Sequence, residues 1–117
     1  MADYLPRFKP GQTFTCKASA AVTGGQLVVV TGDRRVGPAG ATSTAVVGVA
    51  GFDAAVEADV TIHAGGVQRL TASAAIAAGA EVESAADGQI ATATTAPIGV
   101  ALAAASTGDV VDVLMNR

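Results

Sequence analysis

The stretch Ala72-Ser73-Ala74-Ala75-Ile76 decides how this chain is expected to fold. Alanine is the strongest helix former, so residues 72–80, with six Ala and one Ile, favour a helix on propensity alone. The same pattern occurs 54 residues earlier as Ala18-Ser19-Ala20-Ala21-Val22, shortly after Thr13-Phe14-Thr15, where β-branched and aromatic side chains favour a strand. Since the first copy is strand-like, we predict that the second copy is extended too.

The similarity continues beyond these five residues. At the same offset of 54, the chain pairs Gly25 with Gly79, Val28 with Val82, Asp33 with Asp87 and Val36 with Ile90. The offset then falls to about 50, where Val47-Gly48-Val49-Ala50 matches Ile98-Gly99-Val100-Ala101 and Asp59-Val60-Thr61-Ile62 matches Asp109-Val110-Val111-Asp112. We predict two similar β half-units, about 15–64 and 69–114, closed against each other around a shared Val/Ala/Ile core. Two units are too few for a repeat solenoid.

Short β-branched runs separated by Gly, Asp and Ser predict an all-β fold. The expected strands are residues 13–20, 26–31, 44–52, 59–64, 67–72, 80–84, 89–94, 98–104 and 109–114. Gly65-Gly66, between two β-rich runs, is the best hairpin signal in the chain. Strands of this length with such close turns are typical of a small sandwich or barrel.

Size and composition predict a single β domain at residues 13–117, preceded by an extended N-terminal arm at residues 1–12. The chain has 117 residues, 14 of them Gly, with 3 Phe, 1 Tyr and no Trp. A core made mostly of Ala and Val gains less from burial than one rich in large side chains. We therefore expect copies of the chain to stabilise one another.

The arm differs from the rest of the chain. It contains Tyr4 and Phe8, two of only four aromatic residues, and Pro6 and Pro10 favour an extended backbone. Such a segment is typical of an arm that docks on a neighbour or partner. An arm that folds back over its own barrel and a disordered terminus are the alternatives.

The charge of the chain limits the classes of partner that it can bind. The net charge is −3, divided into +3 for residues 1–40 (five basic, two acidic) and −6 for residues 41–117 (two basic, eight acidic), so nucleic acid is not an expected partner.

The charged, proline-containing start does not resemble a signal peptide, and the apolar segment 91–105 is too short for a membrane helix. Cys16 is single and is expected to be a small buried apolar residue.

The chain contains one segment that partly matches a phosphate-binding motif. Gly32-Asp33-Arg34-Arg35-Val36-Gly37-Pro38-Ala39 has the glycine spacing of a phosphate-binding loop, but Pro38 replaces the required Lys and Ala39 the required hydroxyl. We interpret it as a polar hairpin loop whose Arg34 and Arg35 are available for surface contacts with an acidic partner.

No catalytic, metal or cofactor site is predicted. The acidic pairs Glu57/Asp59 and Glu81/Glu83 have strand spacing that puts both carboxylates on one face, which we interpret as a solvated face and not as an acid/base pair. His63, the only histidine, is interpreted as a surface residue beside the hairpin. We therefore expect a binding or structural protein and not an enzyme.

Several segments of the chain resemble the capsid cement, or head decoration, proteins of tailed bacteriophages. They are Tyr4-Leu5-Pro6-Arg7-Phe8-Lys9-Pro10-Gly11-Gln12-Thr13-Phe14, Ala20-Ala21-Val22-Thr23-Gly24-Gly25-Gln26-Leu27-Val28, Val46-Val47-Gly48-Val49-Ala50, Gly65-Gly66-Val67-Gln68-Arg69-Leu70, Ala85-Ala86-Asp87-Gly88-Gln89-Ile90-Ala91-Thr92-Ala93 and Ile98-Gly99-Val100-Ala101-Leu102. These are structural motifs, and together they span nearly the whole chain.

The resemblance implies a β-barrel or β-tulip-like domain on the outer surface of an icosahedral head, made in the host cytoplasm and bound between major capsid proteins. It also implies trimers at local three-fold positions. The expected contact residues are Tyr4, Leu5, Pro6, Arg7, Phe8, Lys9 and Pro10, with Tyr4, Leu5 and Phe8 as apolar anchors. The alternative is a carbohydrate- or host-surface-binding β-module on the virion, against which the lack of Trp argues.

Overall fold

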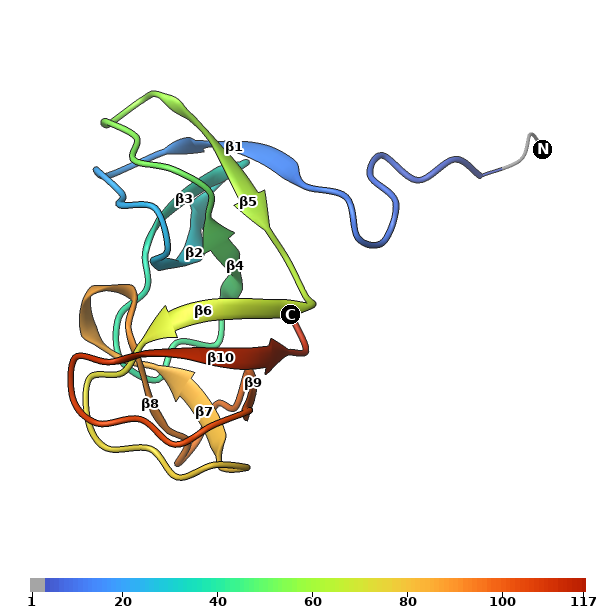
Figure 1. Ribbon diagram of the computed structural model, residues 1–117. Coiled ribbons are helices and arrows are strands. Elements are labelled where there is room, and N and C mark those ends of the chain that lie inside the picture. Colours follow the sequence, from blue (N-terminus) through green and yellow to red (C-terminus); the bar gives the residue numbers. More distant parts are fainter. Residues whose placement is uncertain (1–3) are drawn as a thin grey trace.

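The computed structural model describes residues 4–117, so Met1, Ala2 and Asp3 of the predicted arm lie outside the described residues. This part of the chain forms two groups of five strands (Figure 1). The strands are β1 (Phe14–Ala18), β2 (Leu27–Gly32), β3 (Arg35–Pro38), β4 (Val46–Ala50), β5 (Asp59–His63), β6 (Val67–Thr71), β7 (Glu81–Ser84), β8 (Ile90–Thr92), β9 (Gly99–Ala101) and β10 (Val110–Met115), with one 3-10 turn, η1 (Ala86–Gly88). Within residues 4–117 no helix is long and apolar enough to cross a membrane.

The first five strands form a closed barrel in the order β1-β3-β2-β4-β5. Antiparallel pairing joins β2 to β3 and β4, and β5 to β4 and β1. A short parallel pair between β1 and β3, with Lys17 opposite Arg35 and Ala18 opposite Val36, completes the ring. The barrel therefore leaves no fully unpaired sheet edge, which protects it from pairing with other chains.

The last five strands repeat this arrangement. They form a sheet in the order β6-β10-β9-β7-β8, which repeats the pairings of the first five strands except that no ladder joins β6 to β8. The counterpart of the parallel β1–β3 pair is a single parallel bridge between Ala72 and Ile90. The second unit is thus a barrel of the same topology, closed by one bridge.

Corresponding hydrogen bonds confirm the two half-units, although the strand register equates Asp59 with Val110 and not, as the sequence match predicted, with Asp109. The backbone N–H of Ser19 donates to the Val36 carbonyl (2.8 Å), and that of Ser73 donates to the Ile90 carbonyl (2.8 Å). The antiparallel bridge between Val22 and Ala54 likewise recurs between Ile76 and Ala105. Residues 72–80 therefore form no helix, as predicted against their helix propensity, although they are not extended throughout: bridges at Ala72 and Ile76 are followed by a turn at 78–79. The all-β barrel prediction is confirmed.

The Gly65-Gly66 hairpin prediction is wrong. β5 pairs with β1 and β4, whereas β6 pairs with β10, so the two strands flanking the glycines belong to different sheets. Both glycines have positive φ (67° and 64°), a conformation that suits Gly in any sharp reversal. The pair joins the two barrels because β5 is already paired on both sides.

The interpretation of residues 32–39 as a loop is corrected in its second half. Asp33-Arg34 forms the turn after β2, which ends at Gly32, but Arg35–Pro38 is β3, which lies between β1 and β2. Val36 and Gly37 are buried in this strand. β3 is short and begins with a charged residue, so the local sequence does not predict a strand. It is a strand because β1 and β2 flank it and pair with it.

The apolar residues form two clusters, so the predicted core shared by the halves is present and a second cluster lies within the first half. One lies within the first sheet and consists of Cys16, Ala18, Val22, Val28, Val36, Ala50, Ala54, Val60 and Ile62. The other combines Leu27, Ala39, Val46 and Val49 of the first half with the buried residues of the second half, Ile90 and Val113 among them. Because neighbouring residues of a strand face opposite sides, Val28 enters the first cluster and Leu27 the second.

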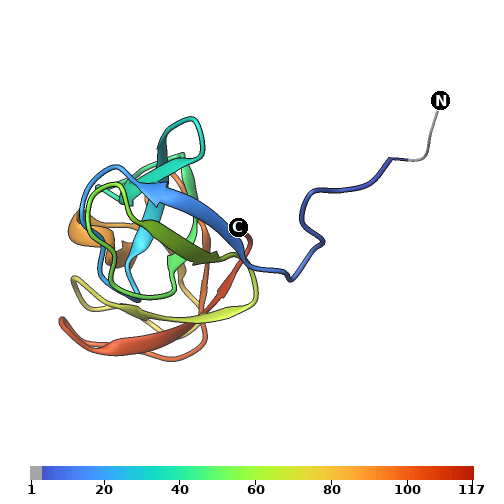
Figure 2. The ribbon, with the colours of Figure 1, turned by 90° about the horizontal axis from the view of Figure 1, so that it is seen from above.

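Polar contacts reinforce this junction between the halves. The hydroxyl of buried Ser84 donates to the Gly40 carbonyl (2.7 Å) and accepts from the Ser43 N–H (2.9 Å). The Gly88 N–H donates to the Ala39 carbonyl (2.9 Å), and the Arg117 guanidinium donates to the Thr44 carbonyl (2.6 Å). The two barrels therefore pack into one body, from which the arm projects (Figure 2).

Candidate interaction surface

The arm leaves the body just before β1 and extends away from both barrels (Figures 1 and 2). Tyr4 is 79% exposed and Leu5 84% exposed. Large apolar side chains held this far from their own core are costly in water and favour contact with another surface. Tyr4 and Leu5 thus have the exposure that the predicted anchors require, although their binding role stays a prediction.

Phe8 behaves differently from the other two predicted anchors. Its ring centroid lies 6.1 Å from that of Phe14, with the rings tilted by 49°, and the Arg34 Cζ lies 5.6 Å from the Phe8 ring centroid. Tilted aromatic pairs and a guanidinium over a ring face are both favourable arrangements. Phe8 is still 41% exposed, so it attaches the root of the arm to the barrel while keeping part of its ring free.

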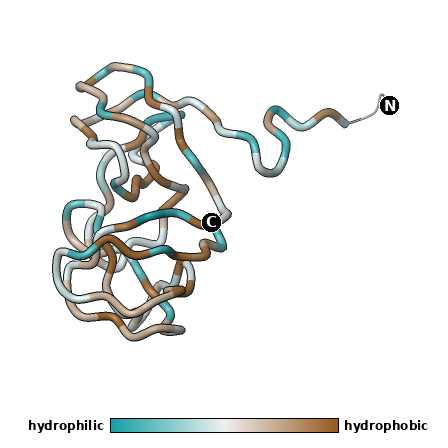
Figure 3. The backbone as a smooth tube through the Cα atoms, viewed as in Figure 1, coloured by the Kyte–Doolittle hydropathy of each residue, from teal (hydrophilic) through white to brown (hydrophobic). Residues whose placement is uncertain are grey.

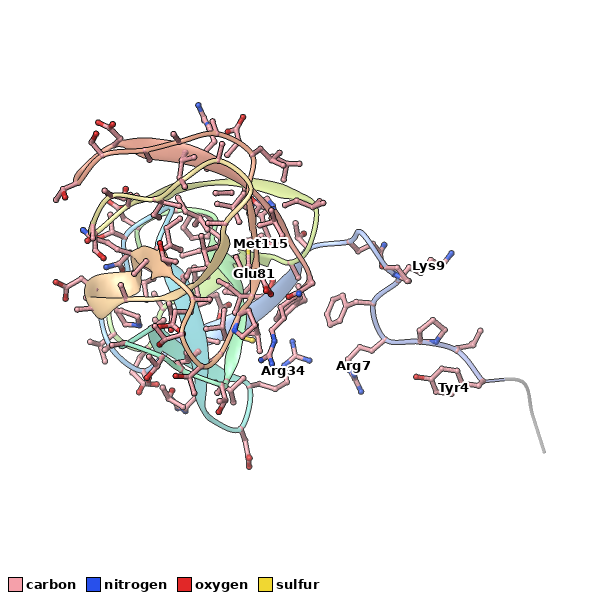
Figure 4. The ribbon with its side chains drawn as sticks, turned by 90° about the horizontal axis from the view of Figure 1, so that it is seen from below. Tyr4, Arg7, Lys9, Arg34, Glu81 and Met115 are labelled. Carbon is pink, nitrogen blue, oxygen red and sulfur yellow. The ribbon has the colours of Figure 1, made fainter. Side chains whose placement is uncertain are left out.

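A tight turn separates the outer arm from the barrel. The Gln12 N–H donates to the Lys9 carbonyl (3.0 Å), and the Gln12 side-chain oxygen accepts from the Lys9 N–H (2.6 Å). Pro6, Arg7, Lys9 and Pro10 are all exposed, and in Figure 4 the Arg7 and Lys9 side chains project into solvent. The arm therefore presents two cations beside its apolar residues.

The structure gives both Arg34 and Arg35 partners inside the chain. Arg34, which points towards the arm in Figure 4, also donates to the Thr15 backbone carbonyl. Arg35 donates to both carboxylate oxygens of Glu57 (2.8 and 2.9 Å). Arg34 thus holds the arm root, and a contact of either residue with an acidic partner stays a prediction.

The two acidic pairs have different surroundings. Glu57 bonds to Arg35 and Asp59 to Lys17 (3.1 Å) on an exposed surface, as expected for a solvated face. Glu83, in contrast, is only 4% exposed, so the prediction of a solvated Glu81/Glu83 face is wrong for this residue. β7 is buried on both faces, so the alternation that predicts one solvated face does not apply.

Buried Glu83 organises the β8–β9 connection. Its carboxylate accepts from the backbone N–H groups of Thr94 (3.0 Å), Thr95 (3.0 Å) and Ala96 (3.1 Å), and from the Thr94 hydroxyl (3.0 Å). These donors, led by Thr95 and Ala96, stabilise the ionised form and lower the pKa of Glu83 to about 2. Glu83 is therefore a structural anion and not a proton donor near neutral pH. The only signal for this contact in the sequence is a Glu that precedes the Thr94-Thr95 pair by 11 residues.

Cys16 and His63 offer no reactive site. Cys16 is buried, as predicted, and burial raises the pKa of its thiol, with the Arg34 charge opposing the change. His63 is exposed at the end of β5, as predicted, but it adjoins the connection between the barrels and not a hairpin. Among residues 4–117 no group of three or more His, Cys, Asp or Glu side chains is placed to hold a metal ion.

An open groove of about 590 Å³ lies where the two halves meet. Its lining includes Gln26, Arg69, Asp87, Gln89 and Val110. The groove is open to solvent and its lining is polar and apolar in about equal parts, unlike the enclosed apolar cavities that usually bind small molecules. The groove adjoins the outer face of the second sheet, because Arg69 and Val110 belong to both.

These features define a protein of two repeated β-barrels with a projecting arm, a class suited to binding through its surface. Residues 7–116 match the family described as phage cement protein, and the chain belongs to this family. It is therefore a head-associated structural protein of a phage particle, in a family of structural proteins rather than enzymes. No curated protein matches the chain.

The fold has a counterpart of known structure. The chain is similar to the head fiber gp8.5 N base of bacteriophage phi29, with a TM-score of 0.75 and 20% sequence identity. The match covers 91% of this chain and 94% of the phi29 chain. At this identity the likeness concerns the fold, which confirms the β-barrel architecture.

Proposed function

We propose that this protein cements the exterior of an icosahedral phage head by binding between major capsid proteins as a trimer at local three-fold positions. The observation that carries the proposal is the arm, which holds Tyr4 and Leu5 clear of the barrels with nearly their whole surfaces exposed. Membership of the phage cement family supports a role on the head. The protein is made in the host cytoplasm and joins the particle at its outer surface.

The arm supplies the main contact with the major capsid protein. Tyr4 and Leu5 enter apolar depressions of the shell, and Arg7 and Lys9 pair with acidic groups around them. Pro6 and Pro10 limit the conformations of the free arm, which lowers the entropy lost on docking. Phe8 contributes through its exposed edge, while Phe14 and Arg34 hold it in place and so set the direction in which the arm leaves the barrel.

Cementing follows from binding the assembled shell more tightly than its separate parts. A ligand that binds only one state stabilises it by mass action. Three arms on one trimer raise the effective concentration of each arm after the first has docked. Modest individual contacts therefore give firm attachment, and a head that carries the protein should withstand higher temperatures than a bare head.

Removal of the outer arm tests this function. Deletion of residues 2–7 leaves Phe8, Phe14 and Arg34 in place, so the barrels should keep their fold. We expect the deletion variant to lose binding to purified expanded heads in a co-sedimentation assay, and to stop raising the temperature at which those heads disassemble. The double variant Tyr4→Ser/Leu5→Ser should show the same loss with the arm at full length.

Val56→Ser is the matched control, because Val56 is an exposed apolar residue (55%) of the β4–β5 connection. It should bind heads like the wild type. Full occupancy of the heads by the arm-deleted protein would refute the proposed role of the arm. Failure of the wild type to bind expanded heads would refute the cement function itself.

A further inference from the structure

The second sheet exposes an apolar face on three adjacent strands. The apolar face consists of Val67 on β6, Val110 and Leu114 on β10, and Val100 and Leu102 on or just after β9, whose exposed fractions range from 36% to 64%. Val67 lies opposite Leu114, and Leu114 opposite Val100, so these three form one row across the sheet. In Figure 3 hydrophobic colours dominate β10.

The first half of the chain shows that the fold does not require this face to be apolar. By strand register, Thr13 corresponds to Val67, Asp59 to Val110 and His63 to Leu114. Gly51 corresponds to Leu102, since their N–H groups donate to Thr61 and Asp112 at matching places. Four of the five equivalent positions on the first barrel thus carry a polar side chain or Gly with the same strand pairing, and the fifth, Val49, which corresponds to Val100, is buried against the second half. The apolar side chains serve a purpose outside the fold of the chain itself.

The charges on the apolar face indicate its partner. Arg69 on β6 lies directly opposite Asp112 on β10, and both are exposed among the apolar residues. A purely apolar partner would bury both charges, and an acidic or basic partner would repel one of them. A second copy of the same face offers an Asp112 for each Arg69 and an Arg69 for each Asp112.

We infer that the apolar face is the surface through which copies of this chain associate, with three such faces meeting at the three-fold axis. This deepens the proposed function by assigning the surface that forms its trimer. The exposed parts of the five apolar side chains amount to on the order of 400 Å² per copy, at the scale of patches that mark interaction sites. This is about half of the roughly 800 Å² per partner of a stable interface, so the polar residues around the apolar face must supply the rest.

The mass of the free protein in solution tests the inference. Light scattering and sedimentation equilibrium should give the wild type three times the chain mass of 11.3 kDa. Val110→Asp and Leu114→Asp should each weaken association by roughly 10- to 100-fold. The fold should accept them, because the first barrel carries Asp59 at the position equivalent to Val110. His63→Asp, the change equivalent to Leu114→Asp on the first barrel, is the matched control and should remain trimeric.

A charge exchange tests the pairing independently of apolar contact. Asp112→Arg should weaken association about tenfold, since it places two cations together, and the double variant Arg69→Asp/Asp112→Arg should restore it. Thr61→Arg, at the equivalent position of the first barrel, should have no effect. Circular dichroism and thermal melting verify that each variant is folded.

A wild type that is monomeric at every concentration, Asp variants with the wild-type mass, or a double exchange as weak as the single change would each overturn the inference. The outcome is separate from that of the cement function. Folded monomeric variants should still bind heads through the arm, with lower affinity because three linked arms are lost. A trimer that fails to bind heads would contradict the cement function and leave the apolar face as the site of association.

Discussion

Glu83 holds three consecutive backbone N–H groups with one buried carboxylate. The residues that it fixes connect β8 to β9, and Ser84, the next residue, ties β7 to residues 40–43 of the first half. One short segment of β7 therefore organises both the second barrel and its junction with the first. A substitution in this segment should therefore affect both the second barrel and its junction with the first.

The pH dependence of stability should reveal the contribution of the ionised Glu83 carboxylate to the folded state. Its pKa in the folded protein, about 2, lies below the ordinary 4.5, so the ionised carboxylate favours the folded state. This contribution is complete above pH 4.5 and is lost as the pH falls from 4.5 towards 2. Glu83→Gln should lower the melting temperature by roughly 5–10 °C at pH 7, with a smaller difference from the wild type at pH 3.

Glu81→Gln is the matched control, because Glu81 is exposed on the same strand. It should melt within about a degree of the wild type, as surface substitutions usually do. Equal effects of the two substitutions at neutral pH would contradict the role assigned to Glu83.

At the scale of elements, β9 and β10 approach each other closely at Gly99. A Cβ at this position would overlap the Leu114 backbone oxygen and stand 3.0 Å from Val113 Cγ1. Gly48 meets His63 in the same way in the first barrel, so the close approach belongs to the repeated unit. The glycine at this place in both copies therefore reflects packing between two strands.

Gly99→Ala should separate β9 from β10 and destabilise the protein by about 1–3 kcal/mol, the usual cost of overpacking. Urea unfolding measures this free energy. Gly40→Ala is the control, because a Cβ at Gly40 would meet no atom within 4 Å. Equal stability of the Gly99→Ala variant and the wild type would show that β9 can move away from β10 without loss.

The sequence predicts the strands better than it predicts their partners. The repeat revealed that residues 72–80 are not helical, since its first copy is strand-like and hydrogen bonds such as those of Ser19 and Ser73 recur. Its half-units, 15–64 and 69–114, separate β5 from most of β6, but the Gly65-Gly66 signal wrongly predicted a hairpin between these strands, because a Gly-Gly signal is local and barrel closure is not. The short β3 was missed for the same reason.

The candidate site shows a similar division. The exposure of Tyr4 and Leu5 could be anticipated from prolines and scarce aromatics, whereas the contact between Phe8 and Arg34 depends on a turn 26 residues away along the chain. The apolar face could be found only after the register was known, since it becomes conspicuous by comparison with Thr13, Asp59 and His63 in the first barrel.

At the scale of the whole molecule, the two barrels are unequal partners. The first has its own apolar cluster, whereas the cluster of the second is completed by Leu27, Ala39, Val46 and Val49 from the first. Without those side chains, Ile90 and Val113 would be exposed on one side to water. The repeat therefore supplied two similar topologies but not two independent cores.

A fragment of residues 65–117 should consequently fail to fold alone, because it loses the side chains that complete its core. Nuclear magnetic resonance of the fragment should show the narrow amide dispersion of an unfolded chain. Addition of a separate fragment of residues 1–64 should restore the dispersion of the native protein. A well-dispersed spectrum of residues 65–117 alone would show that its core is self-sufficient.

The connection at Gly65 brings distant parts of the chain to one end of the molecule. The Gly65 N–H donates to the Arg117 carbonyl (2.7 Å), and residues 11–13 at the arm root line the same depression as Gly65 and Gly66. Any polypeptide that continues from Arg117 would emerge beside the arm, on the side that the proposed function places against the shell. Cargo for display on a phage particle would therefore be better inserted at the turn around Gly79, which lies outside this depression, than appended after Arg117.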